Sequence, residues 1–137
     1  MSGNMEKHDS YTLAYDRIAL ALKQGFPLEA IAIEESIIAD RLISYLIYKG
    51  KSVSIKTSFF ELIDTAKNTS TDFKINIYSQ LDNWRDKRNK MLHGIVKSMP
   101  KTAPEIKADD FIQTATELAE EGLKFTRIVQ NWQRHQN

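Results

Sequence analysis

The side chains best suited to chemistry on a charged substrate lie close together, between Trp84 and Lys101. This segment holds six basic residues and one acidic residue, and His93 lies among them. Arginine presents a fixed fork of donors to a phosphate, and histidine exchanges a proton near neutral pH. We therefore interpret the segment as a candidate phosphate site whose catalytic residues are Arg88, Asn89 and His93. The alternative is an ordinary solvated basic end of a helix.

A helix is expected to present these residues on two of its sides. Its apolar residues recur in steps of four and three, and Arg88 stands in their row, among Ile77, Leu81, Trp84 and Met91. A bare guanidinium is too costly to bury, so Arg88 must have a partner or face a polar cleft. Arg85, Asn89 and His93 recur every four residues and form a second row beside the first.

Glu35 is the expected partner of Arg88. It interrupts the apolar row of an earlier predicted helix, which consists of Leu28, Ile31, Ile38, Leu42 and Tyr45. A carboxylate and a guanidinium that both replace inward-facing residues predict an ion pair, with Glu35 as the supporting acid and Glu34 as the weaker candidate. A purely structural ion pair without chemistry is the alternative.

The hydrophobic periodicity predicts an all-α protein in a single domain of residues 1–137, with residues 1–9 as a disordered tail. Residues 51–57 alternate like a strand, but one lone strand cannot satisfy its own backbone, so we expect a connection there. The economical architecture is an antiparallel bundle of four long helices plus one short helix. The helices are expected over residues 11–24, 27–49, 58–66, 72–93, and from Asp109 or Asp110 past Trp132.

Composition narrows the classes of function. The chain has 137 residues, a formal net charge of +1 and no cysteine, so disulfide and thiolate chemistry are excluded. The three histidines are far apart and form no spacing typical of a metal site, and we expect neither a metal nor another cofactor. No apolar stretch is long enough for a bilayer, and the polar start lacks a signal core, which predicts a cytoplasmic protein without a membrane partner.

The segment from Arg88 to Gly94, Arg-Asn-Lys-Met-Leu-His-Gly, resembles the motif of the HEPN superfamily, in which a histidine follows an arginine after four to six residues. Asn89 directly after the arginine and Gly94 directly after the histidine also fit this motif. The segment ends a late long helix in an all-helical chain, as in HEPN domains. The resemblance covers the helical layout of the whole chain, while its specific residues lie between positions 84 and 94.

The resemblance implies a metal-independent endoribonuclease that cuts single-stranded or loop RNA and leaves a cyclic phosphate and a 5′-hydroxyl. Arg88 would hold the scissile phosphate, His93 would be the general acid–base, and Asn89 would orient the phosphate or its neighbour. The RNA-binding cations would be Arg85, Lys87, Lys90 and Lys97. The resemblance also implies a homodimer with a composite site at its interface, and a toxin or anti-phage effector that an antitoxin or another regulatory partner restrains.

Helical geometry gives an independent reason to expect a dimer. Arg88 and His93 point about 140° apart on one helix, whereas two helices related by a two-fold axis could bring them together. One departure concerns Ile95, because toxins silenced by a nucleotidyltransferase antitoxin commonly carry a modifiable tyrosine there. That mode of control is therefore not expected here, while the ribonuclease motif itself is intact. Since some HEPN proteins are inactive binding modules, a second hypothesis is a non-catalytic HEPN-like module that binds RNA or a partner protein through the same basic helix.

Overall fold

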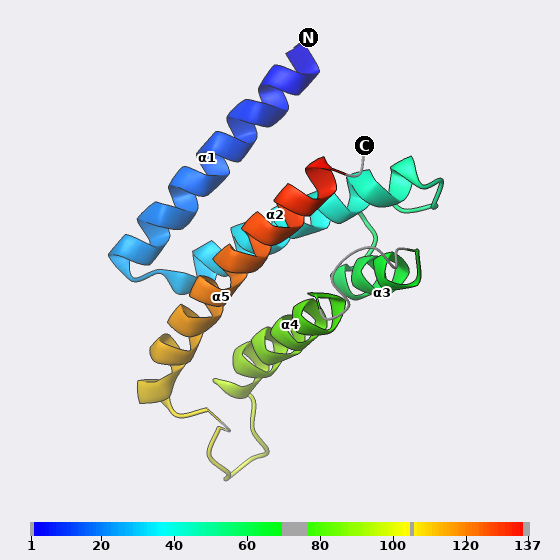
Figure 1. Cartoon of the computed structure of the whole chain (residues 1–137). Helices are drawn as coiled ribbons and strands as arrows, with labels where there is room; N and C mark the ends of the chain where they lie inside the picture. Colours follow the sequence, from blue (N-terminus) through cyan, green and yellow to red (C-terminus); the bar gives the residue numbers. More distant parts are fainter. Residues whose placement is uncertain (1, 70–76, 105, 136–137) are drawn as a thin grey trace.

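A computed structural model describes residues 2–69, 77–104 and 106–135, which form helices and connections without any strand. This all-α structure agrees with the prediction from the periodicity. Figure 1 shows α2 and α5 in the middle, with α1 on one side and α3 and α4 on the other. The helices are α1 (Ser2–Gln24), α2 (Pro27–Tyr48), α3 (Phe59–Thr69), α4 (Ile77–Gly94) and α5 (Ala108–Arg134).

The hydrophobic core lies where α2 meets the other helices. α2 packs against α1, α3 and α5, and α4 packs against α3 and α5. The largest fully buried side chains come from all five helices, and they include Ile18 of α1, Leu42 of α2, Leu62 of α3, Trp84 of α4 and Val129 of α5. One side of α4 therefore packs in the core, and the side chains on its other sides are available for a functional site.

The first helix begins earlier than the sequence predicts. The disordered tail expected over residues 1–9 is helical from Ser2 onward, and Met1 lies outside the described residues. Its first turns are polar, so their own periodicity gives no helix signal. They are held by tertiary contacts, because Lys7 Nζ and the Tyr11 hydroxyl both donate to the Asp40 carboxylate of α2.

The inward face of α2 agrees in part with the expected one, since Ile31, Ile38, Leu42 and Tyr45 are buried as predicted. Leu28 is 38% exposed, whereas Glu34 is fully buried in the row of inward-facing residues Ala30, Ile31, Glu34, Ile37 and Ile38. The apolar row therefore passes through Glu34, and Glu35 lies at its edge.

The predicted boundaries of the middle helices differ in part. α3 continues to Thr69, three residues beyond the expected end at Ala66, and the expected start of the next helix near Asp72 lies outside the described residues. The segment 51–57 is a connection, as expected. None of the helices within the described ranges combines the length and apolar character needed to cross a bilayer.

Candidate active site on α4

The buried side of α4 positions the candidate residues. Trp84 is fully buried, and its indole Nε1–H donates to the carbonyl oxygen of Leu118 on α5 at 2.8 Å. Ile77, Leu81 and Met91 of the same row are also buried. This anchoring against α5 fixes the rotation of α4 about its axis, and with it the directions in which the remaining side chains point.

Arg88 reaches across to α2 and forms an ion pair with Glu35, as the interrupted apolar rows predict. Its side chain is 17% exposed, and that of Glu35 is 28% exposed. Arg88 Nη2 also donates to Asn89 Oδ1 at 2.9 Å. Burial lowers the pKa of the Arg88 guanidinium, although an arginine stays protonated at neutral pH. The pair thus places a positioned cation between α2 and α4.

A cavity of about 290 Å³ lies at the C-terminal end of α4. His93 is exposed there, and the backbone of the next turn is held because Lys97 N donates to His93 O at 3.2 Å. The cavity is lined by one histidine, one amide, two lysines and a glycine: Asn89, Lys90, His93, Gly94 and Lys97. It can therefore receive an anionic group beside a side chain that exchanges protons.

The candidate residues do not all converge on this cavity. Within the described part of the chain, Arg88 is not among its lining residues and faces Glu35 instead. Lys87 lines a groove between α4 and α5 together with Glu117 and Glu121. Arg85 lies over the ring of Phe60 on α3, and it pairs with Asp82 of its own helix. The structure thus brings Asn89, Lys90, His93 and Lys97 together around this cavity. Its described lining does not include Arg85, Lys87 or Arg88, although Arg88 donates to Asn89 and Lys87 shares the other groove with Lys90.

Glu34, the weaker of the two predicted partners of Arg88, is a titratable residue in the core. It is fully buried, and within the described residues neither of its carboxyl oxygens has a hydrogen-bond partner. Burial raises its pKa to about 9, so the group is protonated at neutral pH. Its place in the row through Ala30, Ile31, Ile37 and Ile38 is a sequence signal for it, but that signal does not distinguish Glu34 from the adjacent Glu35.

Removing Arg88, the cation of the part-buried ion pair with Glu35, should destabilise the fold. We expect Arg88→Ala to lower the free energy of unfolding by about 1 to 3 kcal/mol, because Glu35 is then left part-buried without its partner. Urea denaturation measures this loss. Arg85→Ala is the matched control: its partner Asp82 is 45% exposed, so that change should cost less than about 1 kcal/mol. Equal losses for the two variants would contradict a special role of the Arg88 pair.

Comparisons with known proteins do not extend this description, since no family model, no curated protein and no solved structure matches the chain. The resemblance to HEPN domains therefore stays a prediction from the motif and the helical layout. Within the described ranges, no three histidine, cysteine, aspartate or glutamate side chains are grouped so that they could hold a metal ion.

Proposed function

We propose that this chain is a HEPN-like, metal-independent endoribonuclease, an antiparallel helical bundle that cleaves single-stranded or loop RNA at a site shared by two copies. The observation that carries the proposal is the cavity beside His93, because an exposed histidine there lies among Lys90, Lys97 and Asn89. The two lysines attract the phosphate backbone, and the histidine supplies proton transfer at the scissile phosphate.

In the proposed reaction the RNA 2′-oxygen attacks the adjacent phosphorus, and the bond to the 5′-oxygen of the next nucleotide breaks. One base accepts the proton of the 2′-hydroxyl, and one acid returns a proton to the leaving 5′-oxygen. The products are a 2′,3′-cyclic phosphate and a 5′-hydroxyl. His93 serves as acid or base, and the guanidinium of Arg88 stabilises the charge that develops on the phosphate oxygens.

Two observations support a second copy in this site. Arg88 of one chain points toward α2 and does not line the cavity of His93, so one chain alone leaves the two groups apart. Beside the motif, three large apolar side chains are exposed: Leu92 at 44%, Val96 at 76% and Met99 at 74%. A second copy that covers them could bring its own motif to the same phosphate.

The test compares His93→Ala with the parent on a labelled single-stranded RNA in excess chelator. We expect His93→Ala to lower the cleavage rate about 10²- to 10⁴-fold, the contribution of one general acid–base. His135→Ala is the matched control, because that exposed ring lies at the C-terminal end of α5, with its Nδ1 at 2.8 Å from the carbonyl oxygen of Asn131. Cleavage by the parent and by His135→Ala, but not by His93→Ala, with a cyclic-phosphate end supports the proposal. Equal rates for all three proteins would overturn it.

The alternative function is a non-catalytic module that binds RNA or a protein through the same helix. It is favoured by the observation that Glu35 and Asn89 already engage the guanidinium of Arg88. Under this alternative, the parent binds RNA or its partner without cleavage and His93→Ala changes little. Reversing the charge of Lys90 and Lys97 would then weaken binding.

A further inference from the structure

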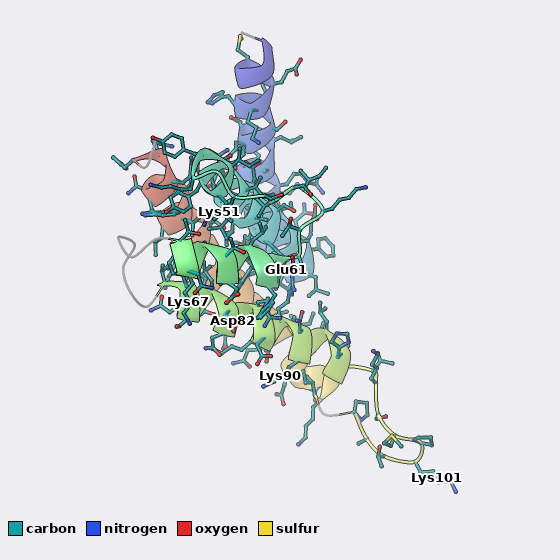
Figure 2. The ribbon with its side chains drawn as sticks, turned by 90° about the vertical axis from the view of Figure 1, so that its right-hand side faces the viewer. Lys51, Glu61, Lys67, Asp82, Lys90 and Lys101 are labelled. Atoms are coloured by element: carbon teal, nitrogen blue, oxygen red, sulfur yellow. The ribbon has the colours of Figure 1, made fainter. Side chains whose placement is uncertain are left out.

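A second cavity, of about 300 Å³, lies in the groove between α3 and α4. Apolar and aromatic side chains of Phe60, Ile63 and Tyr78 line it, together with charged side chains that include Asp64 and Lys67. Figure 2 shows α3 and α4 side by side at this groove, with Lys67 and Asp82 near one another across it. The lining is thus partly apolar and partly charged, which suits a small flat group that has both a ring face and polar edges.

Phe60 provides a stacking surface in this groove. It is 51% exposed, and the guanidinium carbon of Arg85 lies over its ring at 5.1 Å from the centroid. Arg85 is itself fixed, because its Nε donates to Asp82 Oδ1 at 3.0 Å. An aromatic ring and a planar guanidinium that are already positioned bind a nucleobase by stacking without a further ordering cost.

The charges of the groove favour a base over a phosphate. Three carboxylates line it, those of Asp64, Asp82 and Asp86, against the cations Lys67 and Arg85. Asp82 is engaged by Arg85 and Asp86 by Lys90, so Asp64 is the carboxylate with no ion pair among the described residues. A phosphate would be repelled there, whereas a base with N–H donors could donate to Asp64. Guanine presents two such donors side by side.

An ion pair on α4 links a residue that lines this groove to a residue that lines the cavity of His93. Asp86 lines the groove and pairs with Lys90 at 3.0 Å, and Lys90 in turn lines the cavity of His93. Figure 2 shows Asp82 and Lys90 along the same face, toward the loop that carries Lys101. Arg85 and His93 are eight residues apart, which is about 12 Å along a helix. A short stretch of extended single strand spans this distance.

We propose that the groove between α3 and α4 binds one unpaired base of the RNA, preferably guanine, and so fixes the cleaved bond a few nucleotides away. The base stacks on Phe60 and donates its N–H groups to the Asp64 carboxylate. The phosphate that connects this base to the cleaved bond lies beside Lys90. This inference rests on the proposed ribonuclease function, and it adds to it the feature of the substrate that is recognised.

The experiment measures binding and cleavage separately. A fluorescent 2′-O-methyl oligouridine with a single guanine has no 2′-nucleophile, so its binding can be titrated without cleavage. We expect Phe60→Ala to weaken binding of this strand about tenfold or more, the loss of one base stack. Asp64→Ala should abolish the preference for this strand over plain oligouridine. Phe26→Ala is the matched control, since that ring is 58% exposed at the turn between α1 and α2, and it should bind as the parent does.

The cleavable form of the same strand then separates the two proposals. We expect the parent to cut at one fixed distance from the guanine, and Phe60→Ala to cut at scattered positions. Cleavage that depends on His93 but is unchanged in position and affinity by Phe60→Ala would overturn the base site alone. Binding that depends on Phe60 without any cleavage would support the base site and reject the ribonuclease. No binding by the parent would overturn both.

Discussion

Glu34→Gln should raise the free energy of unfolding at pH 7 by about 3 kcal/mol. The parent carboxyl is buried without a hydrogen-bond partner among the described residues, and burial raises its pKa from 4.5 to about 9. At pH 7 the folded chain must keep a proton that the unfolded chain releases, whereas glutamine has nothing to ionise. Urea denaturation of both proteins at pH 7 measures the difference, which is large beside the roughly 5 to 15 kcal/mol of a typical domain.

The pH dependence of this difference identifies its cause. Below the unfolded pKa of 4.5 both states of the parent hold the proton, so the variant has no advantage there. As the pH rises toward about 9, the parent loses about 1.4 kcal/mol per pH unit relative to the variant, and above that the difference is constant. A difference that did not change between pH 5 and pH 9 would contradict a buried neutral carboxyl.

The neighbouring residue supplies a control of opposite sign. Glu35 is 28% exposed and pairs with Arg88, so Glu35→Gln removes a favourable interaction instead of a buried acid. We expect that variant to be less stable than the parent at pH 7, by about 1 to 3 kcal/mol. Stabilisation by both changes would mean that the two carboxyl groups have similar surroundings.

The pair between Arg88 and Glu35 could be predicted because helical periodicity fixes which side of a helix a residue occupies. A charged residue in a row of core positions must then find an opposite charge on a facing helix. The same reasoning predicted one row of Arg85, Asn89 and His93 on this helix. Asn89 and His93 line one cavity, whereas Arg85 lines the groove beside α3.

The burial of Glu34 could not be decided from its own helix. Glu34 and Glu35 are adjacent and both interrupt an apolar row, so either could face inward. The space for Glu34 is provided by Gly122 of α5, whose missing side chain leaves room for the carboxyl. The hydrophobic pattern of each helix alone does not indicate this contact, because the two residues are far apart in the sequence.

The start of α1 was missed for the same reason, and the groove that Lys87 lines was not foreseen either. The first turns of α1 are polar and depend on contacts of Lys7 and Tyr11 with Asp40. Lys87 belongs to the basic segment by sequence, but the rotation of α4 turns it toward Glu117 and Glu121. That rotation is set by the packing of Trp84 against α5, which periodicity alone does not give.

Gly122→Ala should lower the free energy of unfolding by about 1 to 3 kcal/mol, although alanine is the better helix former. A Cβ at this position would lie 2.3 Å from Glu34 Oε1 and 2.5 Å from Trp84 Cζ2. Neither neighbouring side chain can shift without a loss of stability, because Glu34 is enclosed in the core and Trp84 is held by its hydrogen bond to Leu118. Denaturant unfolding of the variant and the parent measures the loss.

Two further variants separate this close contact from a general effect of alanine. Gly3 lies in α1, and outside its chain neighbours and the nearby backbone of that helix no described atom lies within 4 Å of an added Cβ. Gly3→Ala should therefore be neutral or slightly stabilising. Glu34→Ala removes the nearest obstacle, and combining it with Gly122→Ala should cost less than the sum of the single changes, by about 1 kcal/mol or more. Such coupling would show that α2 and α5 meet at Glu34 and Gly122. Strict additivity would contradict that contact and the buried position of the Glu34 carboxyl with it.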